Sequence, residues 1–167
     1  SKIGGGRPPV RPSTDVVLLG FGRVGRALAT LIATSPAKHR VRIVGLLDRS
    51  GYIFDARGLP EKRLRSLAEK KDGGALLTAI GGKAAGALEA LGFMSSHAVS
   101  RPVLVDVTSD ETGPILHAAI ERGFDIVLAN KRPLAGSWES YTRLLDAAAG
   151  AGRSIRFEAT VGAGLPV

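Results

Sequence analysis

Short apolar runs alternate with amphipathic stretches along this chain. The run Asp15–Gly20, DVVLLG, is apolar and rich in β-branched residues, which predicts a buried strand. In the stretch that follows, RVGRALATLIA, apolar residues recur at helical spacing. A second apolar run, Val41–Asp48, predicts another strand. Because a strand, a helix and a strand within about 35 residues form a βαβ unit, we expect the two strands to run parallel.

The same alternation returns in the second half of the chain. Apolar runs predict strands at 102–107, 125–130 and 154–159, and helical spacing predicts helices at 114–122 and 138–149. The segment 51–101 between the halves predicts helices near 61–71 and 84–91, and its role stays open. Alternating strands and helices predict an α/β fold of the Rossmann type, a doubly wound, mostly parallel sheet with helices on both faces.

The composition indicates one ordinary globular domain. Hydrophobic residues make up 44% of the 167 residues and charged residues 23%, which is enough for one sizeable core. The lack of cysteine excludes disulfides, thiolate metal sites and a cysteine nucleophile, and it fits a reducing compartment. No apolar run approaches the about 20 residues of a membrane helix, and the N-terminus lacks the apolar core of a signal peptide. We therefore expect a cytoplasmic protein with no membrane partner.

The formal net charge of +8 raises the question of an anionic partner. Lysines and arginines are spread along the chain, and acids interleave with the densest groups, at 61–65 and 69–71, as on a solvated helix face. Aromatic residues make up only 5%, so platforms for stacking single strands are not evident. Only the charge supports a nucleic-acid binder, and we expect no nucleic-acid partner.

A glycine-rich stretch joins the first predicted strand to the first predicted helix. Residues 20–25, GFGRVG, match the G-x-G-x-x-G pattern, and their place in a βαβ unit with an acid ending the second strand makes the match informative. Gly20 would allow the tight turn, Gly22 the approach of a pyrophosphate, and Gly25 close packing of helix on strand. The N–H groups and dipole of the helix would face the anion. We predict a dinucleotide-binding loop formed by Gly20, Phe21, Gly22, Arg23, Val24 and Gly25.

The end of the second predicted strand bears on which dinucleotide binds. Asp48 stands where an acid is expected to accept hydrogen bonds from the adenosine ribose, which favours NAD. Arg49 and Ser50 follow and could instead hold a 2′-phosphate, which favours NADP. The Asp48 carboxylate would repel a neighbouring phosphate unless the carboxylate turned away. The sequence therefore does not decide between NAD and NADP. Arg49 could also be a solvated loop residue without a ligand.

Two later strands also end in polar residues, at the edge of the sheet where ligands bind in such folds. Thr108 and Ser109 follow one strand and could line the nicotinamide side of the cofactor. Asn130 and Lys131 follow the next, directly before a predicted turn at 132–133. Lys131 could pair with a phosphate, orient a substrate carboxylate, or move a proton if its pKa were lowered. The alternative for Lys131 is a surface lysine.

Three stretches together carry a resemblance to a known family. GFGRVGRAL, ANKRPLAG and FEATVGAGLP occur in this order in homoserine dehydrogenases, and the chain resembles their nucleotide-binding half from about Asp15 to its last residue. The third stretch is the most specific. The resemblance implies an oxidoreductase that interconverts L-homoserine and L-aspartate 4-semialdehyde with NAD or NADP, on the route to threonine, methionine and isoleucine.

The resemblance also implies roles for individual residues. Lys131 matches the family's lysine at the junction of cofactor and substrate, where it would transfer a proton or position the reacting groups. A sodium site, formed chiefly by backbone carbonyls, is implied at Glu158, Val161, Ala163 and Leu165. Hard cations take oxygen ligands, and an irregular segment that contains glycine can turn several carbonyls inward. A plain connection from strand to helix is the alternative for this segment.

The resemblance sets the expected domain organisation. Residues 1–13 would be a disordered or expression-derived tail, 14–158 the NAD(P)-binding domain, and 159–167 the start of a hinge into a substrate and dimerisation domain that this chain lacks. We expect the full-length enzyme to be a homodimer and this chain alone to bind dinucleotide with little or no turnover. Two alternatives remain, namely another small-substrate dehydrogenase such as an aspartate dehydrogenase, and a dinucleotide-sensing module without catalysis.

Overall fold

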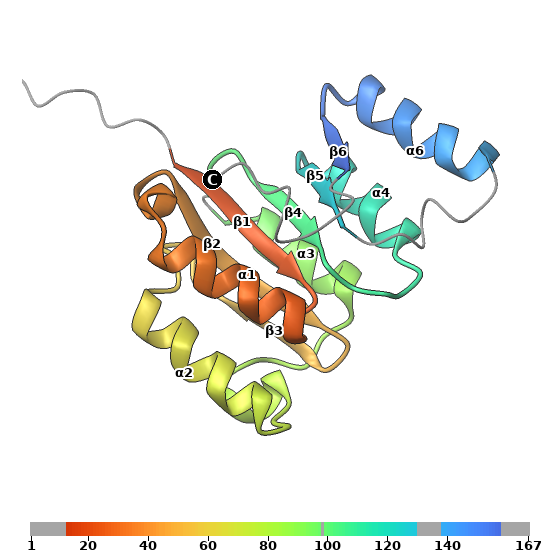
Figure 1. Ribbon diagram of the computed structural model, residues 1–167. Coiled ribbons are helices and arrows are strands. Elements are labelled where there is room, and N and C mark those ends of the chain that lie inside the picture. The colour runs from red at the N-terminus through yellow and green to blue at the C-terminus, as the bar shows by residue number, and fades with distance from the viewer. Residues whose placement is uncertain (1–12, 98, 130–137, 158–167) are drawn as a thin grey trace, which may run out of the picture.

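A six-stranded sheet forms the centre of the computed structural model, which describes residues 13–97, 99–129 and 138–157. The strands lie in the order β3-β2-β1-β4-β5-β6 (Figure 1). All neighbouring pairs are parallel except β2 and β3, which form an antiparallel hairpin. The strands are β1 (Thr14–Leu19), β2 (Val41–Asp48), β3 (Gly51–Phe54), β4 (Val103–Asp106), β5 (Asp125–Leu128) and β6 (Ile155–Phe157).

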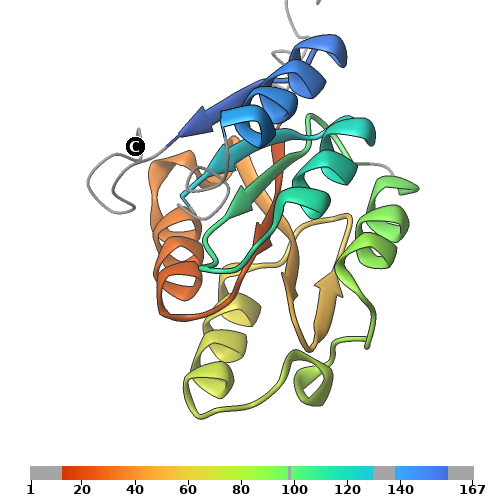
Figure 2. The ribbon, with the colours of Figure 1, turned by 90° about the vertical axis from the view of Figure 1, so that its right-hand side faces the viewer.

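Helices cover both faces of this sheet, and Figure 2 shows the layers: α1 and α2 lie on one side, and α3 and α4 on the other. Helix α6 packs beside α4. The described residues also form two short 3₁₀ helices, η1 and η2. The helices are α1 (Arg23–Thr34), η1 (Pro36–His39), α2 (Glu61–Asp72), η2 (Leu77–Ile80), α3 (Ala87–Ser95), α4 (Gly113–Glu121) and α6 (Trp138–Gly150). The prediction of a doubly wound, mostly parallel α/β sheet is confirmed.

The apolar run of β1 is buried on both faces because successive side chains of a strand point to opposite sides. Val16 and Leu18 pack in the core beneath α1 and α2. Val17 and Leu19 pack in the core beneath α3, α4 and α6. The central strand therefore supplies two separate hydrophobic cores.

The segment 51–101 differs most from what its pattern indicates. It contains the edge strand β3, which the sequence analysis did not predict. Only four residues, GYIF, pair with β2, and so short a run gives a weak strand pattern. Helix α2 agrees closely with the expected 61–71, whereas α3 begins three residues later than expected, at Ala87. Tyr52 and Lys83 exchange backbone hydrogen bonds of 2.9 Å in each direction, so the chain after η2 partly covers the outer edge of β3.

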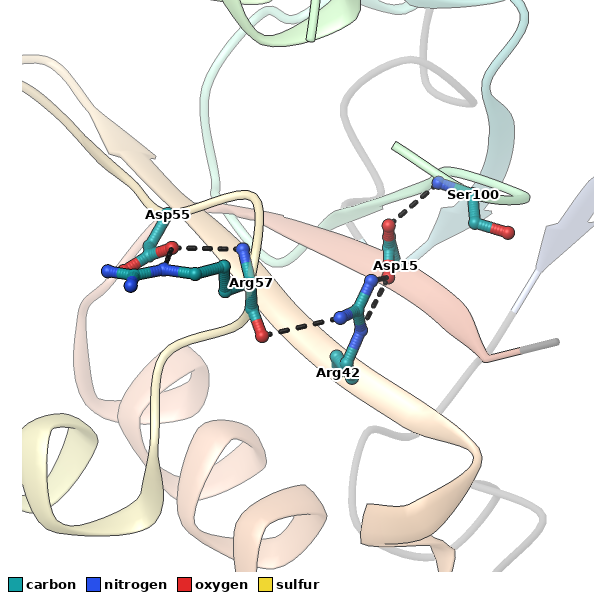
Figure 3. Close-up of polar contacts among 5 residues, drawn as sticks. All are labelled: Asp15, Arg42, Asp55, Arg57 and Ser100. Carbon is teal, nitrogen blue, oxygen red and sulfur yellow. Dashed lines mark hydrogen bonds and ion pairs between the residues drawn. The ribbon is translucent and has the colours of Figure 1, made fainter. Parts of the chain in front are cut away.

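Polar contacts tie the strands together at the amino end of the sheet (Figure 3). The fully buried Asp15 of β1 accepts hydrogen bonds from Arg42 of β2, at 3.0 Å from Nε and 2.9 Å from Nη2. Its other oxygen accepts from the backbone N–H of Ser100, before β4, at 2.7 Å. Arg42 also donates to the carbonyl of Arg57 at 3.3 Å. One carboxylate thus joins three segments that are far apart in sequence.

Candidate cofactor site

A pocket of about 1050 Å³ opens at the opposite, carboxyl end of the sheet. It lies where β1, β2 and β4 end, which is where ligands bind in open α/β sheets. Its lining comes chiefly from the turn after β1, the turn after β2, the end of α2, the start of α3 and the loop after β4. The polar and glycine residues among the lining are Gly20, Gly22, Asp48, Arg49, Ser50, Lys71, Gly86, Thr108, Ser109, Asp110, Glu111 and Thr112.

The turn from β1 into α1 is packed so closely that two of its glycines cannot be replaced without movement. Gly20 has φ +103°, a backbone region that side chains disfavour, and a Cβ there would lie 2.9 Å from Cγ2 of Thr108. A Cβ on Gly25 would lie 2.4 Å from the carbonyl oxygen of Gly20. These glycines allow the tight turn and let the first turn of α1 rest against it, as predicted for the first and third glycines of the motif.

Gly22 is different, because a Cβ built on it meets no atom of the described residues within 4 Å. It is the N-cap of α1 and lines the pocket. The first backbone N–H groups of a helix lack acceptors within the helix, and the helix dipole makes this end electropositive. Gly22 has no side chain that could cap the helix, and no acidic residue occupies the first turn. The space beside Gly22 thus offers an anion close approach to exposed N–H groups.

Asp48 ends β2 and shapes the turn into β3. Its Oδ1 accepts from the backbone N–H and the hydroxyl of Ser50, both at 2.7 Å, and its Oδ2 accepts from Nζ of Lys71 in α2 at 2.8 Å. Burial opposes ionisation of this carboxyl, but the hydrogen bonds from Lys71 and Ser50 outweigh burial, so the pKa of Asp48 lies below its usual value. Asp48 therefore stays ionised and holds Lys71 at the pocket wall.

Asp106 plays a parallel part at the end of β4. Its fully buried carboxylate accepts from the backbone N–H of Thr108 at 3.0 Å and from the hydroxyl of Thr108 at 2.8 Å. The hydroxyl of Thr112, at the start of α4, donates to the other oxygen at 2.5 Å. Asp106 thereby anchors both ends of the loop 108–112, which forms one wall of the pocket.

An ion pair links the two walls at the rim of the pocket. Nε of Arg49 donates to Oδ2 of Asp110 at 3.1 Å, and Nη2 of Arg49 pairs with Oδ1. The side chain of Arg49 is 84% exposed and that of Asp110 35% exposed. The pair therefore spans from the turn after β2 to the loop after β4 on the solvent side.

The structure brings most of the predicted cofactor residues together. Those that line this pocket are Gly20, Phe21, Gly22, Asp48, Arg49, Ser50, Thr108 and Ser109. Arg23, Val24 and Gly25 form the first turn of α1 beside it, with Val24 exposed. Asn130, Lys131 and the predicted sodium ligands Glu158, Val161, Ala163 and Leu165 lie outside the described residues.

Sequence reasoning did not identify Lys71, Asp106 or Asp110 as part of this site. Lys71 lies 23 residues beyond Asp48, and nothing in a run of helix-face charges marks it as a pocket residue. Asp106 could have been identified from the sequence, because residues 106–108, DVT, repeat the pattern of residues 48–50, DRS: an acid ends a strand and a hydroxyl follows two positions later.

Across the described ranges, no helix is long and apolar enough to span a membrane.

The glycine turn, the open N-terminus of α1 and the pocket at the carboxyl end of a parallel sheet define a dinucleotide-binding domain of the Rossmann class. The family model for the homoserine dehydrogenase NAD-binding domain matches residues 20–158. The chain therefore belongs to the homoserine dehydrogenase family, in its NAD-binding domain.

Individual relatives agree with this assignment. Homoserine dehydrogenase of Pyrococcus horikoshii is 33% identical over 159 residues, which cover 92% of this chain and 46% of that protein. A bifunctional aspartokinase/homoserine dehydrogenase of Haemophilus influenzae is 29% identical, over 92% of this chain and 18% of that protein. The chain thus spans less than half the length of these curated relatives.

Solved structures show the same fold. A hyperthermophilic archaeal homoserine dehydrogenase in complex with NADPH superimposes with a TM-score of 0.68 at 28% identity, over 86% of this chain and 43% of that one. The homoserine dehydrogenase of Thermoplasma acidophilum gives 0.65 at 26% identity, over 87% of this chain and 43% of that one.

Proposed function

We propose that this chain is the cofactor-binding part of an NAD(P)-dependent homoserine dehydrogenase that interconverts L-homoserine and L-aspartate 4-semialdehyde. The observation that carries the proposal is Gly22, where the N-terminus of α1 faces open space inside the pocket. A glycine that no neighbour requires is explained by a ligand that approaches its backbone. Family membership supplies the reaction, which belongs to threonine and methionine biosynthesis.

The pocket fits a dinucleotide in its parts. The N–H groups that follow Gly22 would hold the pyrophosphate, and Thr108 and Ser109 would line the nicotinamide side. At the ribose end, Lys71 and Arg49 supply two cations. A 2′-phosphate would find charge-assisted donors there, so we propose NADP(H) as the preferred cofactor and NAD(H) as the weaker one.

Lys71 changes the part expected of Asp48. Both oxygens of Asp48 already accept hydrogen bonds, from Ser50 and from Lys71. A ribose hydroxyl would have to share them. Asp48 would then act chiefly through the turn and through Lys71, and this arrangement is why NADP(H) is favoured over NAD(H).

Catalysis needs parts of the enzyme beyond this pocket. A bound nicotinamide would supply or accept the hydride. Lys131, next to Asn130, would move a proton on the substrate oxygen or position the reacting groups. A sodium ion at Glu158, Val161, Ala163 and Leu165 would support the segment after 158, and a second domain would hold the substrate and form a homodimer. Because catalysis needs the substrate held against the nicotinamide, we expect residues 1–167 alone to turn over little or nothing.

The test is homoserine-dependent reduction of NADP or NAD by the full-length protein. Lys131→Ala should lower kcat strongly while cofactor affinity stays within about tenfold. A full-length protein that binds dinucleotide but never reduces it with homoserine would contradict the proposal and favour a sensing module.

A further inference from the structure

Two cations at the ribose end of the pocket each have a carboxylate partner, but the two pairs differ in exposure. Lys71 and Asp48 lie mostly buried against the wall. Arg49 and Asp110 lie at the rim, where water reaches both side chains. An exposed pair contributes little to stability and is easily exchanged for another partner. Arg49 is therefore the cation that an incoming anion can recruit at the smaller cost.

Asp110, the partner of Arg49, lies in the loop 108–112, which Asp106 anchors to the core. The backbone N–H of Asp110 donates to the hydroxyl of Thr108 at 3.3 Å. That hydroxyl donates to the buried Asp106. The carboxylate of Asp110 is thus positioned by a chain of contacts that begins in the core, whereas Arg49 is a long exposed side chain. When a ligand draws Arg49 away, Asp110 and its negative charge stay at the rim.

We propose that Asp110 is a specificity-determining residue that competes with the ribose 2′-phosphate of NADP(H) for Arg49. The proposal rests on the dinucleotide site proposed above. NADP(H) must break the pair to bind Arg49 and then tolerate a carboxylate near its phosphate. NAD(H) carries no 2′-phosphate, so it leaves the pair intact. Asp110 thus narrows the preference for NADP(H) that Arg49 and Lys71 create.

The experiment is calorimetric titration of this chain with NADPH and with NADH. Asp110→Asn keeps the size of the side chain but removes its charge. We expect NADPH to bind about three- to tenfold more tightly to this variant, and NADH to bind within about twofold of the wild type. The ratio of the two dissociation constants is the quantity to compare.

Two further variants separate this effect from general charge and from loop structure. Asp55→Asn removes the same charge from an exposed pair with Arg57 at the other end of the sheet, and it should leave the ratio unchanged. In an Arg49→Ala background, Asp110→Asn should shift the ratio less, because the competition for Arg49 is gone and only the direct repulsion between Asp110 and the phosphate remains. A loop effect would persist undiminished in that background.

The outcomes distinguish the two proposals. If the wild type binds neither dinucleotide, the proposed cofactor site is wrong, and this inference falls with it. If the wild type binds but Asp110→Asn leaves the ratio unchanged, or changes it equally without Arg49, the site stands and the role of Asp110 is overturned.

Discussion

The two ends of the sheet use aspartates in opposite ways. At the amino end, Asp15 accepts hydrogen bonds from Arg42 and Ser100, which lie 27 and 85 residues away (Figure 3). At the carboxyl end, Asp48 and Asp106 each accept from a residue only two positions ahead. The amino end ties strands together, whereas the carboxyl end shapes the turns that follow β2 and β4 and holds Lys71 at the pocket wall.

The pockets at the two ends match this difference. The carboxyl end opens on about 1050 Å³, bordered by a helix N-terminus and two cations. A smaller pocket of about 330 Å³ lies at the amino end, beside Arg42 and Arg57, both of which are already engaged with acids. The amino end is therefore arranged for stability and the carboxyl end for a ligand.

The largest expected effect comes from breaking the contacts of Asp15. Arg42→Met would leave a fully buried carboxylate without its cation. Because an uncompensated buried charge is costly, the free energy of unfolding should fall by about 3–5 kcal/mol. The thermal midpoint should then drop by about 10 °C. Dinucleotide affinity of the folded variant, measured below that midpoint, should stay within about twofold of the wild type, since the pocket lies at the other end.

Asp55→Asn is the matched control for Arg42→Met, because it breaks an exposed pair close by. We expect it to leave the midpoint nearly unchanged. Equal effects of the two variants would show that burial of Asp15 does not matter. A strong loss of dinucleotide affinity in folded Arg42→Met would contradict the claim that the amino end of the sheet does not affect ligand binding at the carboxyl end.

A smaller loss of stability is expected from a substitution at Gly25, which supports both the packing of α1 and the predicted dinucleotide-binding turn. Gly25→Ala places a Cβ 2.4 Å from the carbonyl of Gly20, so the turn must shift. Overpacking of this kind destabilises by about 1–3 kcal/mol, and dinucleotide affinity should fall with it. Urea unfolding and titration on the same sample check both. Unchanged stability would mean that α1 does not rest on the turn as the structure shows.

The smallest effect is the acid dependence of stability. The pKa of Asp48 is lowered in the folded state, as is that of Asp55, through its hydrogen bond with Arg57. A lowered folded pKa means that the contribution is fully present above the unfolded value, near pH 4, and is lost as the pH falls through the folded value. Asp48→Asn and Asp55→Asn should each flatten the fall in stability below about pH 4.

Salt distinguishes the two acids. At about 1 M salt the pair of Asp55 with the exposed Arg57 is screened, so the difference made by Asp55→Asn should shrink. The pair of Asp48 with Lys71 is mostly buried, and its difference should persist. If salt removed both differences equally, Asp48 would not be sheltered at the pocket wall.

Much of the fold and the centre of the site were predictable because their signals are local. The apolar run of β1, the helical spacing of α1 and the glycines between them specify one βαβ unit. Sequence reasoning also placed Asp48 at a strand end, where the structure confirms it.

The rest depends on contacts that sequence spacing does not reveal. Strand β3 is four residues long, and its pairing rests on the turn that Asp48 forms with Ser50. Lys71 reaches the pocket only because α2 packs beside α1. Asp15 looked like a polar boundary of a strand, yet it is fully buried, because its partners come from distant segments. Long-range pairing of charges is set by the tertiary fold.

The most direct test of the central claim is calorimetric titration of the wild type and Gly22→Val with NADPH and NADH. Among the described residues, no atom lies within 4 Å of a Cβ at this position, so the variant should fold with a thermal midpoint within a few degrees of the wild type. We expect saturable binding by the wild type, NADPH tighter than NADH, and affinity at least about tenfold weaker in the variant. No binding of either dinucleotide by the wild type, or equal binding by Gly22→Val, would contradict the dinucleotide site at the N-terminus of α1.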